Sequence, residues 1–462
     1  MFRIFGHYIP KSLFLLGSTE NLILLLSVYF SISLGASVTG IDTPIWPKAL
    51  LFSIVMILVM TAMGLYQHIT EDDTTLVFTR ILLSFLLGVV LLTFIYKMVP
   101  ELFFGRNVFL LAVLSSFFGI ISCRLVWHLR QDHILTQNTL VIGAGKKAEQ
   151  LERLNRMGNA GVTISGYLNI EGSGPRMIKD DRIFDIDPDL TNLSKIIADN
   201  HIREIVIALD ERRKFIPIDR ILDCKMRGVR VVDVNTFLER QLGKICLKTL
   251  HPSSLIFTEG FIQNEAKTFI KRVFDVAVSS IILLLALPVM LVTALAILIE
   301  SGGRGSIIYR QQRVGANGKT FSIYKFRSMQ ENAEVDGKAV WASKNDARVT
   351  AVGKFIRKTR IDELPQLINV LKGDMSFVGP RPERPEFVEN LSREIPFYSL
   401  RHHVKPGITG WAQICYPYGA NVDDAREKLQ YDLYYLKNNT IFLDLLILIQ
   451  TAAVILLCRG AR

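Results

Sequence analysis

Four long apolar runs occupy the first part of this chain, and they constrain its fold more than any other feature. They cover about Leu13–Ala36, Ala49–Tyr66, Val77–Met98 and Val108–Trp127. Each is close to the ~20 residues that a helix needs to cross a bilayer. Few charges interrupt the runs, so spanning helices are favoured over the helices of a soluble bundle. The sequence therefore predicts a membrane α-helical bundle over residues 1–130.

Basic residues at both ends of this bundle predict its orientation. An even number of spans places both ends on one side of the membrane. Arg3 and Lys11 precede the first run, while Arg124 and Arg130 close the last. Because cytoplasmic flanks are enriched in Lys and Arg, this side is predicted to be the cytoplasm.

Composition narrows the partners of the rest of the chain. The 462 residues are 50% apolar, yet their formal net charge is +11. This combination is typical of a membrane protein whose basic soluble part faces anionic lipid or phosphate. The sequence has no Cys/His finger spacing and no strongly basic helix, which argues against nucleic acid as a partner. Its five cysteines are scattered, which argues against a disulfide framework or a zinc site.

Near residue 138 the long apolar runs give way to short apolar runs separated by polar stretches, which predicts a soluble α/β module over residues 131–250. Strand-like runs, separated by helical stretches, occur at Thr139–Ile142, Glu204–Leu209 and Arg230–Val234. This alternation is typical of doubly wound, Rossmann-like folds. Gly143 and Gly145 belong to a G-x-G-x-x-A turn after the first strand. The turn predicts either a nucleotide-binding site or a structural or regulatory module without a bound dinucleotide.

The apolar stretch Phe269–Ile299, which follows a linker over residues 251–266, is long enough to cross the membrane. Two features argue against a simple crossing. Lys267 precedes the stretch and Arg304 follows it, so both flanks look cytoplasmic. Pro288 lies in its middle, where it removes a backbone hydrogen bond and kinks or breaks a helix. The residues alone leave a re-entrant hairpin and a kinked spanning helix as alternatives.

A basic hairpin is predicted after this stretch. Short strands are expected at Ile307–Arg313 and Phe321–Arg327, around a turn at Gly315–Gly318. Lys325 and Arg327 are among the basic residues of the second strand. The hairpin is therefore either a lipid-facing surface or a contact for an anionic ligand.

A pair of adjacent carboxylates among basic residues is the clearest indication of a catalytic site. Asp362 and Glu363 follow the basic run Arg357–Arg360, and an apolar helical pattern after them ends at Gly373. The turn-rich segment Gly379–Glu383 comes next. Carboxylates near arginines and rigid turns suit a metal-assisted phosphate site, but the helix dipole also favours such a pair at a helix start. On their own, these residues fit both interpretations.

Two segments near the C-terminus have less specific patterns. Lys405–Tyr418 is rich in Pro, Gly and aromatic residues and predicts a loop suited to an interface. Ile441–Cys458 is apolar but contains Asp444 and Gln450. These polar residues favour an interfacial or packed amphipathic helix over a fifth span.

Several motifs together resemble those of the bacterial sugar transferase family. They are KTRIDELPQLINVLKGDMSFVGPRPE at Lys358–Glu383, Tyr324–Met329 upstream and Pro406–Trp411 downstream. The resemblance covers about Lys267 to the C-terminus, with the motifs in the family's order. The family comprises monotopic phosphoglycosyl transferases that start polysaccharide assembly on polyprenyl phosphate. The four spans and the Rossmann-like module resemble its long form, found in exopolysaccharide, capsule and O-antigen pathways.

The resemblance implies a mainly α (α+β) catalytic domain over residues 267–462, with a re-entrant helix over 267–300 broken at Pro288. It implies transfer of a sugar 1-phosphate from a UDP-sugar to undecaprenyl phosphate, with release of UMP. The implied partners are these substrates and the lipids of the bacterial cytoplasmic membrane, with the catalytic domain on the cytoplasmic face. A homodimer is compatible with the long form. Relatives often have Ser before the proline, where this chain has Leu287.

Site residues follow from the same resemblance. Asp362 is expected to be the nucleophile of a covalent aspartyl-phosphosugar mechanism, and Glu363 to bind Mg²⁺. Neighbours on a helix point about 100° apart, so one carboxylate can face the phosphorus while the other holds the metal. The residues expected to contact substrate phosphate are Arg381, Lys325, Arg360 and Arg327.

Two other functions remain as alternatives. One is an NAD-dependent nucleotide-sugar enzyme that works through Gly143–Ala148. The other is a membrane scaffold or regulator that senses a nucleotide through the same module.

Overall fold

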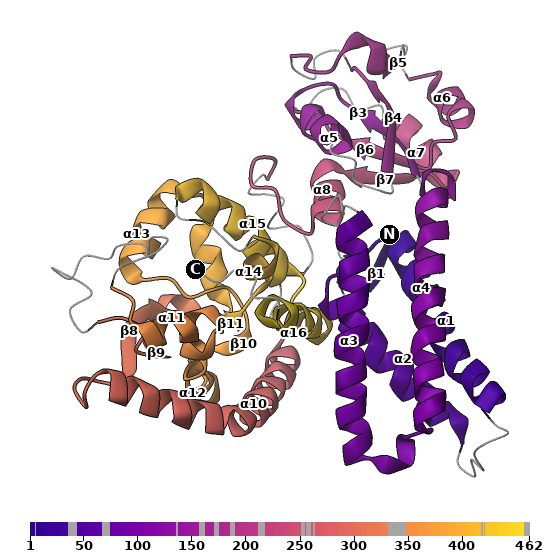
Figure 1. Cartoon of the computed structure of the whole chain (residues 1–462). Coiled ribbons are helices and arrows are strands. Elements are labelled where there is room, and N and C mark those ends of the chain that lie inside the picture. The colour runs from indigo at the N-terminus through magenta and orange to yellow at the C-terminus, as the bar shows by residue number, and fades with distance from the viewer. Residues whose placement is uncertain are drawn as a thin grey trace. The chain divides into compact units, whose positions relative to one another are not determined.

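The computed structural model describes all residues except 5, 36–43, 67–73, 135–136, 157–161, 171–174, 185–189, 211–217, 251–254, 256–259, 262–263, 331–347, 417–418, 420 and 457–462. The chain divides into two compact units (Figure 1). The first comprises residues 1–4 and 8–251, and the second comprises residues 5–7 and 252–462. A short hairpin of β1 (Phe2–Ile4) and β2 (His7–Ile9) begins the chain.

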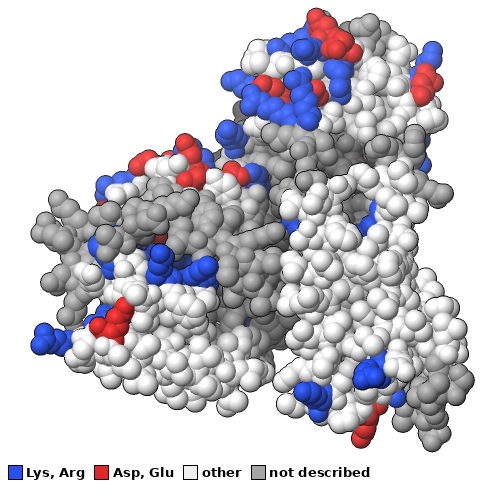
Figure 2. Space-filling view, viewed as in Figure 1, with Lys and Arg blue, Asp and Glu red and all other residues white. Residues whose placement is uncertain are grey.

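Four long apolar helices form the N-terminal part of the first unit, as the sequence predicts. They are α1 (Lys11–Gly35), α2 (Ile45–Ala62), α3 (Thr74–Met98) and α4 (Arg106–Ile134). Each has the length and hydropathy of a membrane-crossing helix. Their outward faces expose large apolar side chains, and Figure 2 shows few charges along their sides. Such faces are suited to contact with lipid tails.

A buried ion pair joins α1 to α4. Glu20 is 0% exposed, and its carboxylate accepts hydrogen bonds from the Arg124 guanidinium at 2.6 Å and from the Tyr66 hydroxyl. A charge among apolar helices is costly unless a partner satisfies it. The pairing explains how two charges are tolerated within otherwise apolar segments.

A five-stranded parallel sheet follows, which confirms the parallel strands expected of the predicted α/β module. Its strands are β3 (Gln137–Ile142), β4 (Val162–Leu168), β5 (Ile183–Phe184), β6 (Glu204–Ile207) and β7 (Arg230–Asp233), in the order β5-β4-β3-β6-β7. The accompanying helices are α5 (Lys146–Arg156), α6 (Leu193–Asp199), α7 (Ile218–Met226) and α8 (Val234–Leu242). On β3, Val141 packs into one apolar core while Leu140 and Ile142 pack into another. The central strand is therefore apolar on both faces, as its uninterrupted apolar sequence predicts.

The described residues of the second unit are mainly helical, with two small two-stranded sheets. Its helices are α10 (Glu265–Glu300), α11 (Ala351–Lys358), α12 (Gln366–Lys372), α13 (Pro385–Glu394), α14 (Trp411–Cys415), α15 (Val422–Lys437) and α16 (Ile441–Leu456). The strands β8 (Ile308–Val314) and β9 (Thr320–Phe326) form the predicted antiparallel hairpin. The strands β10 (Ser376–Val378) and β11 (Gly407–Thr409) pair in parallel. Two short 3₁₀ turns, η5 (Ile361–Glu363) and η6 (Tyr398–His403), complete the part that carries the site.

The long apolar helix α10 is bonded to the rest of the second unit near both of its ends. Near its start, the Arg272 guanidinium donates to the Val370 and Leu371 carbonyls at 2.5 and 2.6 Å. Near its end, Ile297 packs in an apolar core, and the Glu300 carboxylate accepts from the Val352 amide at 3.1 Å. Between these ends the helix contains Pro288 and bends visibly in Figure 1. The apolar residues of its middle are largely exposed.

The prediction of an interface loop over Lys405–Tyr418 is wrong for most of that segment. Residues 407–409 form β11 and residues 411–415 form α14. Trp411 is 7% exposed and stacks on Tyr434. A Cβ on Gly407 would lie 2.0 Å from the nitrogen of Gly379, the residue after β10, so only glycine permits the two paired segments to approach so closely. The glycines therefore allow the segment to pack in the core, where a surface loop was predicted.

The C-terminal helix α16 packs against its own unit. Leu443 and Ile447 are 0% exposed, and Asp444 is equally buried. The Asp444 carboxylate accepts from Lys271 Nζ at 2.6 Å and from the Tyr435 hydroxyl at 2.8 Å. A packed amphipathic helix, one of the two forms favoured from the sequence, agrees with these contacts.

Candidate active site

A strained turn sets the position of the acidic pair. Helix α11 ends at Lys358, and Arg360 then adopts a left-handed backbone with φ of 60°. This conformation costs a non-glycine residue about 1–2 kcal/mol. Asp362 and Glu363 follow in the 3₁₀ turn η5, not in an α-helix as expected. Successive side chains on a 3₁₀ turn point about 120° apart, so the two carboxylates still face different directions.

Three basic side chains converge on Glu363. Its Oε1 atom lies 3.0 Å from Lys325 Nζ, 3.4 Å from Arg381 Nη2 and 3.7 Å from Arg360 Nη1. Burial alone would raise the pKa of Glu363, but these three charges outweigh it and hold the pKa well below its usual range. The structure therefore brings together three of the four residues predicted to contact phosphate, and keeps Glu363 ionised.

Asp362 has a very different environment, although it is the next residue. It is 9% exposed, and its Oδ1 atom is buried without a hydrogen-bond partner among the described residues. Burial, followed by the negative charge of Glu363, raises the pKa of Asp362 to about 6. An ionised carboxylate without hydrogen bonds is poorly stabilised and correspondingly reactive toward an electrophile. The pair thus combines one anion held by three close cations with one whose Oδ1 atom has no hydrogen-bond partner among the described residues.

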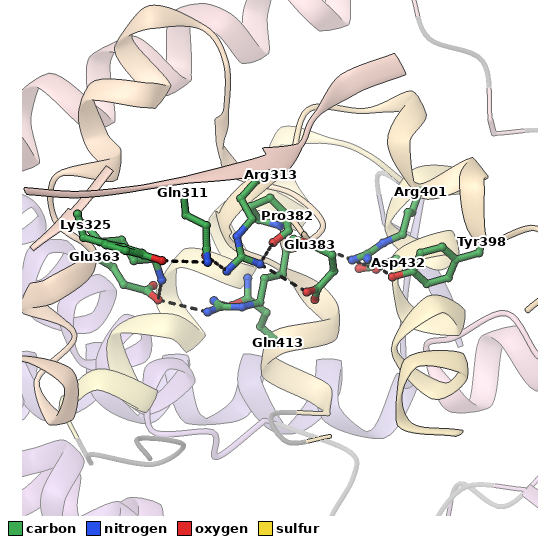
Figure 3. A network of polar contacts seen from close by, with 12 residues as sticks. Gln311, Arg313, Lys325, Glu363, Pro382, Glu383, Tyr398, Arg401, Gln413 and Asp432 are labelled. Atoms are coloured by element: carbon green, nitrogen blue, oxygen red, sulfur yellow. Dashed lines mark hydrogen bonds and ion pairs between the residues drawn. The ribbon is translucent and has the colours of Figure 1, made fainter. Parts of the chain in front are cut away.

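Arg381 reaches the pair from the turn between β10 and α13. Its Nη1 atom donates to Gln413 Oε1 at 3.2 Å, while Nη2 approaches Glu363. Figure 3 shows Gln413 and Glu363 in the same network of polar contacts. Gln413 is not predicted from the sequence, although it lies two residues after Trp411, the last residue of the downstream motif.

Arg327 lies beyond the end of β9 and is oriented differently from Lys325. Its Nη2 atom donates to the Arg304 carbonyl at 3.1 Å. Strand alternation would place residues 325 and 327 on one face, but β9 ends at Phe326. A contact between Arg327 and substrate phosphate therefore stays a prediction.

Comparison with known proteins identifies the family. The model of the family described as bacterial sugar transferase matches residues 266–458. The uncharacterized sugar transferase EpsL of Bacillus subtilis (strain 168) is 38% identical over 193 residues, which cover 42% of this chain and 90% of that protein. This chain belongs to the bacterial sugar transferase family.

Other relatives match this chain over part of their length. UDP-N-acetylgalactosamine-undecaprenyl-phosphate N-acetylgalactosaminephosphotransferase of Aeromonas hydrophila is 46% identical over 239 residues, 52% of this chain and 55% of that protein. UDP-glucose:undecaprenyl-phosphate glucose-1-phosphate transferase of Xanthomonas campestris pv. campestris is 29% identical over 374 residues, 77% of this chain and 72% of that protein. The chain spans about half the length of several relatives that it matches.

The bacterial sugar transferase site offers few ligands for a divalent cation on its own. Among the described residues, no group of three or more His, Cys, Asp or Glu could hold a metal. Mg²⁺, however, is usually bound by one or two carboxylates together with substrate phosphates and water. The three cations described around Glu363 all contact Oε1, which leaves Oε2 as a ligand, and Asp362 Oδ1 has no partner among the described residues. The donor set therefore fits Mg²⁺ when a bound diphosphate completes the coordination.

The glycine-rich turn of the parallel-sheet module is closed by a carboxylate of the chain itself. The amides of Lys146 and Lys147, at the start of α5, donate to Asp210 Oδ2 and Oδ1 at 2.8 and 3.1 Å. A Cβ on Gly145 would lie 2.2 Å from Asp210 Oδ2. These amides are the donors that a pyrophosphate would need at a helix start. Asp210 occupies the anion position, so a nucleotide at Gly143 and Gly145 would have to displace it.

Proposed function

We propose that this chain transfers a sugar 1-phosphate from a UDP-sugar to undecaprenyl phosphate, the first membrane step of polysaccharide synthesis. Support comes from the family and from relatives whose names state this type of transfer. The observation that carries the proposal is the asymmetry of the acidic pair. Glu363 is held ionised by three cations, whereas Asp362 is buried beside it with an oxygen that lacks a hydrogen-bond partner among the described residues.

The reaction proceeds in two steps, through a covalent intermediate on Asp362. An Asp362 carboxylate oxygen attacks the β-phosphorus of the UDP-sugar, a P–O bond forms, and the bond to the α-phosphate oxygen breaks. UMP leaves with that electron pair. A phosphate oxygen of undecaprenyl phosphate then attacks the same phosphorus, forms undecaprenyl-diphosphate-sugar and releases the Asp362 carboxylate. Because the donor and acceptor react in turn, they need not occupy the site together.

The basic residues around the pair reduce repulsion between an anionic nucleophile and an anionic donor. Lys325, Arg360 and Arg381 lie within 4 Å of Glu363 and can neutralise charge on the phosphoryl oxygens. We propose that Glu363 Oε2 holds Mg²⁺, which would stabilise negative charge on the diphosphate as a Lewis acid. At neutral pH a carboxyl group with a pKa of about 6 is mostly ionised, so Asp362 needs no general base.

Helix α10 is proposed to enter the membrane and return on the cytoplasmic face. Both of its end regions are bonded to the same compact unit, while its middle is apolar and exposed. A straight spanning helix of this length would separate its ends by about 50 Å across the bilayer. Labelling of cysteines introduced at Lys267 and Arg304, in a background without native cysteines, tests this topology. Labelling of either position from outside the membrane would exclude the re-entrant form.

The transfer is tested by UMP release from a panel of UDP-sugars, with the full-length protein in lipid nanodiscs, undecaprenyl phosphate and Mg²⁺. Asp362→Asn should abolish release, because an amide is not a competent nucleophile. Asp423→Asn is the matched control, since Asp423 is exposed and pairs with Arg426 on α15. Full activity of the Asp362→Asn protein would overturn the nucleophile assignment. Absence of turnover by the unmodified chain with every donor would overturn the proposed function.

A further inference from the structure

The backbone of the turn that carries Arg381 is bonded from outside at both of its ends. The Pro380 carbonyl accepts from the Gly407 amide at 2.9 Å, and the Glu383 carbonyl accepts from the Val314 amide at 2.9 Å. The turn itself lies in neither a helix nor a strand. Such a segment depends on its surroundings to satisfy its polar groups.

The two carbonyls between these ends accept hydrogen bonds from arginine side chains. Arg401 Nη2, on η6, donates to the Arg381 carbonyl at 3.0 Å. Arg313 Nη1, on β8, donates to the Pro382 carbonyl at 3.1 Å. Figure 3 shows Arg313 and Arg401 approaching the turn from different elements. Four consecutive carbonyls, residues 380–383, are thus fixed by four donors from distant parts of the chain.

The Arg401 guanidinium is itself buried and has further partners besides the turn. Arg401 is 6% exposed and Asp432, its ion-pair partner at 2.8 Å, is 2% exposed. Its Nη1 atom also donates to the Tyr398 hydroxyl at 2.8 Å. A buried ion pair contributes little net stability compared with apolar residues of similar volume. The main effect of the Arg401–Asp432 pair is therefore on the geometry of the turn and not on the stability of the fold.

Arg381 depends on this geometry because its side chain contacts two groups at once. Its guanidinium lies between Glu363 at 3.4 Å and Gln413 at 3.2 Å. Displacement of the turn by about 1 Å would break this arrangement, and a displacement of that size can reduce a reaction rate by about 100-fold.

We propose that Arg401 and Arg313 are positioning residues for the transfer, which fix the backbone of residues 380–383 so that Arg381 is presented to the donor phosphate. Neither residue needs to touch the substrate for this role. The inference rests on the proposed function, because transfer provides its readout.

A double-mutant cycle tests the proposal. Single-turnover UMP release is measured for Arg401→Lys in the unmodified chain and in an Arg381→Ala background. Lysine keeps the positive charge beside Asp432 but cannot reach both the Arg381 carbonyl and the Tyr398 hydroxyl. The expected result is a loss of about 100-fold in the unmodified chain and no further loss when Arg381 is already absent. Arg313→Lys should behave in the same way.

Two further variants separate positioning from general destabilisation. Arg393→Lys is the matched control, because Arg393 forms an exposed pair with Glu389 on α13, and it should leave release unchanged. Tyr398→Phe removes one partner of Arg401 without adding or removing charge. It should cause a smaller loss that also disappears in the Arg381→Ala background, and it carries the test if Arg401→Lys does not fold.

Equal losses in both backgrounds, with an active unmodified chain, would overturn the positioning role and leave the proposed function intact. An unmodified chain that releases no UMP from any donor would overturn the proposed function, and this inference with it.

Discussion

Removal of the Asp362 charge should stabilise the protein while it abolishes transfer. The folded chain holds this carboxyl with a buried oxygen that lacks a hydrogen-bond partner among the described residues, and raises its pKa from 3.8 to about 6. A folded-state pKa above the unfolded value means that folding favours the protonated form. The stability of the folded state therefore falls as pH rises from about 4 to about 6, and the full cost persists at neutral pH.

The size of this cost follows from the pKa. A rise from 3.8 to about 6 corresponds to about 3 kcal/mol once the group is fully ionised. An asparagine side chain at this position would have nearly the same shape and no charge, so Asp362→Asn should recover up to about that amount at pH 7.5. At pH 4.5 the carboxyl is mostly protonated in the folded chain but mostly ionised in the unfolded chain, so the two proteins should differ by only about 1 kcal/mol.

Thermal unfolding of the full-length chain in detergent micelles at pH 4.5 and pH 7.5 provides the assay. For a unit of this size, about 3 kcal/mol corresponds to a rise in apparent Tm of about 6–12 °C at the higher pH. Asp423→Asn, which removes an exposed carboxylate, should shift the apparent Tm much less. An Asp362→Asn protein no more stable than the unmodified chain at pH 7.5 would refute the claim that Asp362 carries a poorly stabilised charge.

Three further outcomes follow from the geometry of the site and the sheet module. The rate of UMP release under single-turnover conditions should rise with pH around a midpoint near 6, because only ionised Asp362 attacks; a flat profile between pH 5 and 7.5 would contradict this. Lys325→Met should reduce release by about 100-fold, because one of the cations around Glu363 is lost, whereas Lys319→Met on the exposed turn of the same hairpin should have little effect. Isothermal titration of the full-length chain with NAD should show no binding, because Asp210 closes the glycine-rich turn. The substitution Asp210→Ala should expose the α5 amides to anions. Strong NAD binding that is unchanged in Asp210→Ala would contradict the closed turn.

Local patterns are sufficient to predict most elements of the fold. The apolar runs predict α1 to α4 because membrane-spanning length is a property of contiguous residues. The strand at 139–142 is also predicted, since a buried parallel strand is apolar on both faces. The acidic pair and three of its basic neighbours can be named from the sequence because they lie in recognisable motifs.

The geometry of the site cannot be predicted in the same way. The hydrogen bonds of Arg313 and Arg401 to the Arg381 turn join positions 69 and 20 residues apart, and no periodicity records such contacts. The segment 405–418 resembles a surface loop because Pro and Gly usually mark loops. Here the glycines serve close packing of β10 against β11, which is visible only when both strands are in place.

The contacts of α10 link the proposed membrane insertion to the catalytic pair. Helix α12 begins three residues after Glu363, and its last carbonyls accept from Arg272 on α10. Asp275, one turn further along α10, accepts from the Ser376 hydroxyl and the Phe377 amide on β10, which leads into the Arg381 turn. The same face of α10 therefore holds both segments that carry the site. Because these contacts are short, and those of Asp275 are buried, the depth at which α10 rests in the membrane should also set the depth of Asp362 relative to the lipid headgroups.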